Sequence, residues 1–189
     1  MNTQAMEDRF LESLVAMLPS SPRRLNQLLE SDAELLRLPG GDTVLAVTTD
    51  SIVEEIELGL YEDPYLIGWM TVMVNVSDLA AVGARPLGIL LDQTFRPDTA
   101  ARVLERTQSG VRDACRAAGI HVLGGDLNFS SLPKFGGTAL GLISDGPILT
   151  RRGCRPGDLL YSSGRVGQGA AFALTSLRPG PVCSFRPPP

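Results

Sequence analysis

The sequence has little of the chemistry on which many catalytic sites depend. It contains one histidine, His121, and three widely spaced cysteines, Cys115, Cys154 and Cys183. A single histidine argues against a His-based zinc site and against a serine or cysteine hydrolase. The cysteines form neither a CxxC pair nor a disulfide framework. Any chemistry must therefore rest on other side chains.

A basic surface, a membrane span and a secretory signal are also missing. The 189 residues include 17 basic and 21 acidic ones, a net charge of −4 that argues against broad nucleic-acid binding. The most apolar run, residues 67–82, is shorter than the ~20 residues of a membrane span and contains Asn75 and Asp78. Glu7 and Glu12 argue against a signal peptide in this segment, and we expect none. We expect a cytoplasmic protein with no nucleic-acid partner and no membrane partner.

Hydrophobic periodicity predicts an α/β (α+β) fold with a mixed sheet and long helices. Pro64 and Gly83 bracket one long helix, and a second covers residues 99–118. Runs of apolar and β-branched residues between turn signals predict strands over residues 43–49, 87–95, 120–123, 136–144 and 159–163. Weaker helical patterns cover residues 5–18, 23–36 and 170–174, and residues 54–57 are expected in an acidic loop or a short strand. Residues 1–37 are thus predicted to be an N-terminal helical segment, residues 38–174 the main domain, and residues 175–189 a Pro-rich, disordered tail.

The first long helix carries polar residues along one face. Gly68, Thr71, Asn75 and Asp78 recur at spacings of three and four residues, and most of their neighbours are apolar. A buried carboxylate is costly unless it is paired or binds a cation. Asn75 and Asp78 therefore either bond to nearby loop backbone or form a polar seam under a site, with Asp78 as a cation ligand.

Two further acids follow predicted strands. Asp50 ends an apolar strand, and Asp126 follows Gly124 and Gly125, which allow a phosphate to approach the backbone. Oxygen ligands without an imidazole suit Mg²⁺, which usually arrives with phosphate. The GxxxxGK[ST] and GxGxxG phosphate motifs are absent from the sequence. A bound nucleotide would therefore have to be held by residues outside these motifs.

Four segments resemble one enzyme superfamily. Residues 74–86 (VNVSDLAAVGARP) resemble the N-x-S-D-(L/I)-A-A-M-G-A-x-P segment of thiamine-monophosphate kinases, and residues 48–54 (TTDSIVE) resemble their T-T-D-(T/S)-(L/I)-V-E motif. Residues 124–126 resemble G-G-D-T, and residues 151–167 resemble R-x-G-A-x-P-G-D-x-(I/L)-Y-V-T-G-x-L-G. The order of the motifs identifies the superfamily of aminoimidazole ribonucleotide (AIR) synthetase and selenophosphate synthetase. The acid after the two glycines favours the kinase branch.

The resemblance implies a fold, a cofactor pair and a reaction. The fold is a ferredoxin-like mixed sheet with long helices on one face, an ATP-binding domain that dimerises through its sheet. The reaction transfers the γ-phosphoryl group of ATP to a small-molecule acceptor, thiamine monophosphate, and needs no catalytic side chain beyond the metal ligands. Carried over by motif, the Mg²⁺ ligands are Asp50, Asp78 and Asp126, with Asp32 as a fourth. The residues lining the nucleotide phosphates are Thr49, Ser51, Asn75, Gly124 and Gly125.

The sequence departs from the family pattern in three places. The family's G-D-D-A motif aligns with residues 30–33 (ESDA), which keep one of the two aspartates. Glu57 stands where the family has a substrate-side histidine, and we expect it in the substrate site. The resemblance ends near Thr175, before the family's second domain, which predicts a truncation or a frameshift. A nucleotide-binding, dimerising homologue without transfer activity, or an enzyme with another acceptor, therefore stays open.

Other notable residues have simpler interpretations. His121 is expected to be structural at the start of a buried strand, and Cys115 is expected in a helix core. Arg151 and Arg152 are interpreted as part of a solvated turn, with phosphate contact as the alternative.

Overall fold

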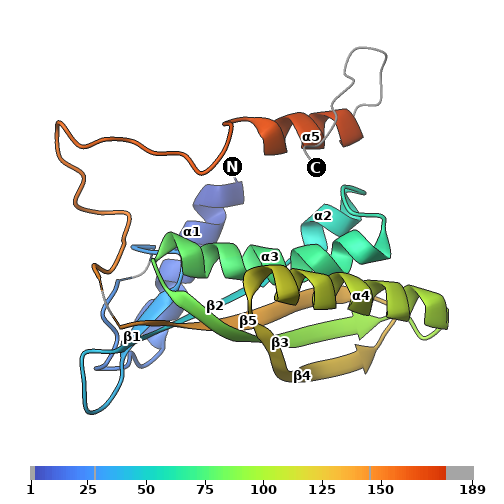
Figure 1. The fold of residues 1–189 in the computed structure, drawn as a ribbon, viewed down its shortest axis with the longest axis horizontal. Helices are drawn as coiled ribbons and strands as arrows, with labels where there is room; N and C mark the ends of the chain where they lie inside the picture. Colours follow the sequence, from blue (N-terminus) through green and yellow to red (C-terminus); the bar gives the residue numbers. More distant parts are fainter. Residues whose placement is uncertain (1–2, 28, 145, 178–189) are drawn as a thin grey trace.

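A computed structural model describes residues 3–27, 29–144 and 146–177 of the chain. Its helices and strands follow one another along the chain as α1 (Thr3–Met17), β1 (Glu34–Arg37), β2 (Val44–Ser51), α2 (Val53–Glu57), α3 (Pro64–Ala81), β3 (Arg85–Phe95), α4 (Ala101–Ala118), β4 (His121–Phe129), β5 (Lys134–Ile143) and α5 (Gln168–Leu177) (Figure 1). The two long helices and the α/β class predicted from the sequence are confirmed.

The strands form one mixed sheet in the order β1-β2-β5-β3-β4. Only β3 and β4 pair in parallel, and α4 is the crossover between them; the other neighbours are antiparallel. Both long helices lie on the same face of the sheet (Figure 1). This is the mixed sheet with helices on one face that the family resemblance implies.

Local chemistry sets the ends of the long helices. Asp63 caps α3 by accepting a hydrogen bond from the backbone N–H of Tyr65, at 3.0 Å, and Pro64 occupies the first turn. Gly119 ends α4 in the left-handed conformation, with φ of 66°. These residue types explain why helix boundaries were predictable from the sequence.

Two glycines allow α3 and α4 to pack closely. A Cβ atom on Gly68 would lie 1.9 Å from the carbonyl oxygen of Thr107, and one on Gly110 would lie 2.0 Å from that of Tyr65. The helix backbones therefore touch at these two positions. Arg106 adds a bidentate ion pair to Asp63 across the same contact, at 2.7 and 2.8 Å.

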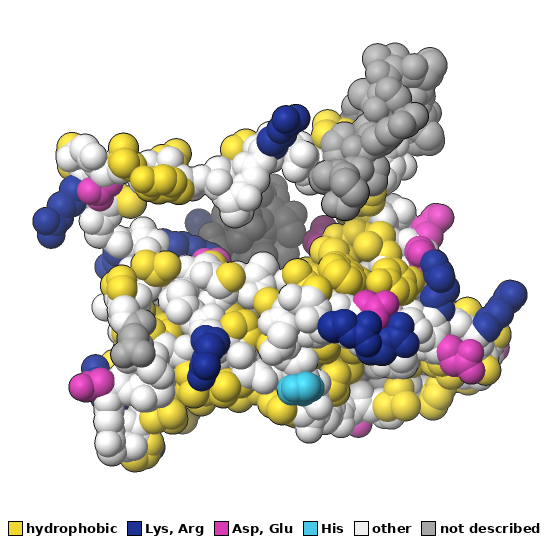
Figure 2. Space-filling view, in the orientation of Figure 1, with side chains coloured by type: hydrophobic (Ala, Val, Ile, Leu, Met, Phe, Trp, Pro, Cys, Tyr) yellow, Lys and Arg dark blue, Asp and Glu magenta, His cyan; other side chains and the backbone are white. Residues whose placement is uncertain are grey.

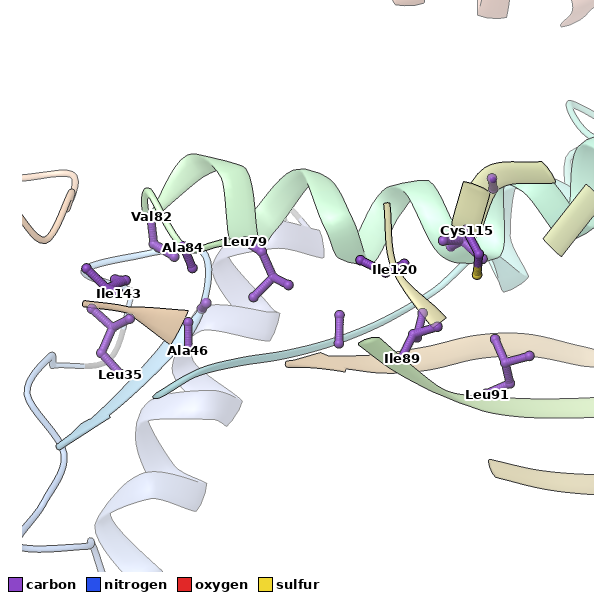
Figure 3. Close-up of a cluster of buried hydrophobic side chains, with 14 of the residues drawn as sticks. Leu35, Ala46, Leu79, Val82, Ala84, Ile89, Leu91, Cys115, Ile120 and Ile143 are labelled. Atoms are coloured by element: carbon purple, nitrogen blue, oxygen red, sulfur yellow. The ribbon is translucent and has the colours of Figure 1, made fainter. Parts of the chain in front are cut away.

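The main core fills the space between these helices and the sheet. Leu79, Ala84, Ile89 and Leu91 point into the same layer in Figure 3. The buried cluster also includes Leu35, Val44, Ala46, Val72, Val111, Ala114, Cys115, Ala139 and Ile143. The expected helix-core position of Cys115 is confirmed.

The helix expected over residues 23–36 is wrong. Residues 34–37 form edge strand β1, because pairing with β2 buries Leu35 completely against Ala46, which also has no exposed surface. Packing against the sheet overrides a weak helical pattern here. Residues 1–37 are therefore not wholly helical.

Three shorter elements also differ from the expectations. Residues 53–57 form helix α2 rather than a loop or strand, and residues 159–163 form no strand. Strand β4 is longer than expected and exposed along its whole length, so His121 does not start a buried strand. The reason is that β4 is the edge of the sheet and α4 leaves both of its faces accessible. Exposed hydrophobic side chains over this edge are visible in Figure 2.

The chain continues past β5 through an irregular segment into α5, at the top of Figure 1. The short helix expected over residues 170–174 is confirmed within α5. Most of the expected Pro-rich tail, residues 178–189, lies outside the described residues. In the described ranges, no helix is long and apolar enough to cross a bilayer.

Candidate functional site

The polar face of α3 meets the carboxyl end of β2. Thr48, on the helix-facing side of β2, donates a hydrogen bond from its hydroxyl to Oδ2 of Asp78, at 2.8 Å. Thr71 and Asn75 lie on the same helix face with no exposed surface, and Asp78 is half-buried at its end. The expected polar seam is therefore present, with Asp78 at the point where it reaches solvent.

Asn75 holds the backbone of Asp50. Its Oδ1 accepts from the Asp50 N–H at 2.9 Å, and its Nδ2 donates to the Asp50 carbonyl at 3.2 Å. A third hydrogen bond runs from Nδ2 to the carbonyl of Thr71, at 3.0 Å. Asn75 thus uses its amide to position Asp50, and its contact with a nucleotide stays a prediction.

Asp78 lies in an environment that disfavours its charge. Partial burial is the main reason that its pKa is raised, and the negative charges of Asp50 and Asp32 raise it further. The hydrogen bond from Thr48 and the charge of Arg151 act in the opposite direction. Asp32 and Asp50 are therefore near enough to Asp78 to act on it, and the three acids gather negative charge at this end of β2.

Asp32 reaches this cluster from the loop before β1, where its neighbour Ala33 is buried in the core. The guanidinium of Arg151 forms an ion pair with Asp32. Ser31 stands where the family motif has its first aspartate, and its hydroxyl donates to the carbonyl of Ala33 at 2.8 Å. Ser31 therefore has a structural role in its loop.

The oxygen donors of this cluster suit a hard cation. Asp32, Asp50 and Asp78 provide carboxylates, and Thr48 provides a hydroxyl beside them, with no nitrogen or sulfur ligand among them. Among residues 3–27, 29–144 and 146–177, no three His, Cys, Asp or Glu side chains stand ready to hold a metal ion. The donor set fits Mg²⁺ in kind, and its members would have to turn toward the ion.

Thr49 and Ser51 lie on the opposite face of the sheet from Thr48, because side chains alternate along a strand. The Thr49 hydroxyl donates to the carbonyl of Gly137 at 2.9 Å. With Thr138 and Lys134, these residues line a polar cleft of about 230 Å³. The two hydroxyls predicted to line the phosphates therefore lie on the face of the sheet opposite α3 and α4, which we call the uncovered face (Figure 1).

Asp126 is not brought to the other three acids within one chain. It lies on β4, where it pairs in register with Asp92, and β5 and β3 separate β4 from β2. Three strand spacings place it about 14 Å from β2. Because Asp126 is in register with Asp92, its side chain lies on the uncovered face of the sheet. Asp50 comes two residues after Thr48 on the same strand, so its side chain lies on the helix side. Its carboxylate accepts a hydrogen bond from Asn128 at 2.6 Å.

The two glycines before Asp126 have a clear structural reason. Gly124 and Gly125 have φ of 149° and 148°, and a Cβ atom on Gly125 would lie 2.0 Å from the carbonyl oxygen of Leu91. Only glycine fits this close approach of β4 to β3. Whether the same backbone also meets a phosphate stays a prediction.

Glu57 is exposed at the end of α2, directly after the carboxyl end of β2. Its place in a substrate site stays a prediction. Sequence reasoning missed two contributors: Thr48, which bonds to Asp78, and the ion pair between Lys134 and Asp92 on the uncovered face, at 2.5 Å. Thr48 carried a usable signal, since it directly precedes the T-D pair of the matched motif.

Comparison with known proteins agrees with the motifs. A family model described as AIR synthase related protein, N-terminal domain, matches residues 30–143. The chain is 34% identical to a thiamine-monophosphate kinase of Methanospirillum hungatei, covering 90% of this chain and 56% of that protein. It is 31% identical to a selenide, water dikinase of Myxococcus xanthus, covering 69% of this chain and 37% of that protein. The chain thus spans about half the length, or less, of these relatives.

Solved structures share the fold. A structure of AaThiL complexed with AMPPCP and TMP superposes with a TM-score of 0.70 at 22% identity, covering 95% of this chain and 61% of that one. A thiamine-monophosphate kinase from Stenotrophomonas maltophilia gives a TM-score of 0.62 at 29% identity, covering 88% of this chain and 51% of that one. The chain belongs to the AIR synthase related family, of which it carries the N-terminal domain.

Proposed function

We propose that this chain is a phosphotransferase of the thiamine-monophosphate kinase type, using ATP and Mg²⁺. The observation that carries the proposal is the cluster of Asp32, Asp50 and Asp78 at one end of β2. Such a cluster needs positive charge, and the Mg²⁺ that accompanies a nucleotide supplies it. The kinase names of the relatives, at 31–34% identity, support the same reaction class.

The chain's own residues would hold and orient the metal-bound nucleotide. Asp32, Asp50 and Asp78 are the proposed Mg²⁺ ligands, and the ion would neutralise charge on the transferred phosphoryl group. Asn75 holds the backbone of Asp50 and Thr48 orients Asp78, so both would act by positioning a ligand. No side chain is required to form a covalent intermediate in this reaction.

A homodimer would bring the fourth acid to the site. On the face opposite α3 and α4, Leu90 is 41% exposed, and alternating residues of β2 and β5 are only half-buried. An apolar sheet face of this kind is typical of an interface. We propose that two copies pair through it and that Asp126 of the partner subunit contributes to the nucleotide site. The cytoplasmic location expected from the sequence stays a prediction.

Ser31 favours a second candidate function. The family motif has an aspartate pair where this chain has Ser31 and Asp32, and the Ser31 hydroxyl bonds within its own loop, donating to the carbonyl of Ala33 at 2.8 Å. A domain with one ligand fewer would bind nucleotide and dimerise without transferring phosphate. An altered acceptor, suggested by Glu57, is the remaining alternative.

One experiment separates these functions. The full chain is titrated with Mg·ATP by calorimetry and then incubated with Mg·ATP and thiamine monophosphate, with thiamine diphosphate measured by chromatography. Binding with product formation supports the kinase. Binding without product supports the non-transferring domain, and ADP release with a different phosphate acceptor supports the altered specificity. Absence of Mg·ATP binding contradicts all three.

A further inference from the structure

The segment that follows β5 is fastened to the loop before β1. The backbone N–H of Arg151 donates to the carbonyl of Glu30 at 2.8 Å, and its Nη1 donates to the carbonyl of Leu29 at 3.2 Å. Arg152 adds a longer ion pair to the Glu30 carboxylate, at 3.6 Å. We call residues 147–152 the strap and residues 29–32 the loop that it holds.

The strap also packs at its other end. Leu149 lies beside Gly83 at the end of α3, where a Cβ atom on the glycine would be 3.5 Å from the leucine side chain. The strap therefore spans from the end of α3 to the loop that carries Asp32. Arg151 contacts Asp32 directly and is near enough to Asp78 for its charge to lower the pKa of that carboxyl.

The held loop is in a strained conformation. Leu29 has φ of 60°, and it is the one residue other than glycine with positive φ among those the structure describes. The left-handed region is unfavourable for a branched side chain, so this conformation persists only where surrounding contacts impose it. The hydrogen bond from Arg151 to the Leu29 carbonyl is such a contact.

We propose that Arg151 serves as an exchangeable counter-ion of Asp32, and that a divalent cation must displace it to bind, releasing the strap from the loop. The proposal rests on the proposed function, which makes Asp32 a cation ligand. The guanidinium already occupies the Asp32 carboxylate. A doubly charged ion at the same carboxylate would repel it, so the two occupants exclude each other.

The ion pair is suited to exchange. The Arg151 side chain is 52% exposed and that of Asp32 is 35% exposed, so water and salt screen their attraction. Coupling of this kind is reciprocal: Arg151 weakens cation binding by the same factor by which the cation weakens the strap contact. Cation binding, loop strain and strap position then form one linked equilibrium.

The test measures cation affinity directly, with Mn²⁺ as the probe and its electron paramagnetic resonance signal as the readout. We expect Arg151→Met to bind Mn²⁺ about 5-fold more tightly than wild type, at the low end of measured couplings because the pair is exposed. Arg155→Met is the matched control, since it removes the same charge at an exposed position of the same segment, outside the strap; its effect should stay below about 2-fold. Arg151→Lys, which keeps the charge, should stay close to wild type.

Hydrogen exchange gives a second readout that requires no turnover. The amide of Arg151, bonded to Glu30 in the metal-free protein, should exchange faster when Mg²⁺ is added. Asp78→Asn tests the underlying site separately. If Asp78→Asn abolishes Mn²⁺ binding while Arg151→Met leaves it unchanged or weaker, the counter-ion role is overturned and the cation site stands. If neither wild type nor any variant binds Mn²⁺, the proposed function itself is contradicted.

Discussion

Replacing Asn75 by alanine tests the link between the helix face and the site. Asn75 has no exposed surface, and its amide is the hydrogen-bond partner of both the N–H and the carbonyl of Asp50. In the alanine variant, the N–H and the carbonyl of Asp50 lose their hydrogen bonds to Asn75 while they stay partly buried. An unsatisfied buried group costs about 1–3 kcal/mol, so the free energy of unfolding should fall by that amount.

The expected change is measurable by thermal unfolding. For a chain of this length, 1 kcal/mol lowers the melting temperature by about 3 °C, so Asn75→Ala should melt about 3–9 °C below wild type. Ser77→Ala is the matched control. Ser77 lies on the exposed side of the same helix and bonds only to the carbonyl of Val74 in its own turn, so its loss should cost less than about 0.5 kcal/mol.

The same variant has a second consequence at the site. Without Asn75 the backbone of Asp50 loses its fixed position, so Mg·ATP affinity should fall as well as stability. If Asn75→Ala melts within about 2 °C of Ser77→Ala, which corresponds to less than about 1 kcal/mol, the amide clamp does not hold Asp50 and the reasoning is refuted. A loss of stability with unchanged Mg·ATP affinity would show that Asn75 stabilises the core and does not position the site.

Three further predictions follow from the packing, the charges and the uncovered face. Gly110→Ala should destabilise the protein by about 1–3 kcal/mol in urea unfolding, because its Cβ would meet the Tyr65 carbonyl at 2.0 Å, whereas Gly169→Ala, with no atom within 4 Å, should be neutral or stabilising. In the metal-free protein the pKa of Asp78 is raised in the folded state, so folding binds a proton and stability falls as pH rises from the unfolded value of 3.8 through the raised value. Asp78→Asn should remove that part of the pH dependence, and unfolding at a series of pH values checks it; an unchanged slope would contradict the burial of this carboxylate. Leu90→Arg should convert a dimer into a monomer in light scattering, and an unchanged mass would exclude the uncovered sheet face as the interface.

The two long helices and most strands were predictable because their signals are local. Asp63 with Pro64 at one end of α3, and Gly119 at the end of α4, mark boundaries through capping chemistry that a short stretch of sequence contains. Strand β1 was not predictable in this way. Its identity depends on Leu35 packing against a distant strand, which outweighs the local helical pattern.

The candidate site shows the same division between local and long-range information. The spacing along α3 correctly placed Asn75 and Asp78 on one polar face. No local pattern indicates that Asp50 and Asp126 lie on opposite faces of the sheet, since this depends on strand order and register. The pairing of Arg151 with Asp32 joins residues 119 positions apart and was equally hidden.

The central claim is that the acids at the end of β2 hold a metal-bound nucleotide. Calorimetric titration with Mg·ATP of wild type, Asp50→Asn and Asp42→Asn tests it most directly, because Asp42 is an exposed acid at the opposite end of β2, paired with Arg37. The account predicts that Asp50→Asn loses at least about 10-fold in affinity, a change of about 1.4 kcal/mol, while Asp42→Asn binds like wild type. Equal affinities for wild type and Asp50→Asn would contradict the claim.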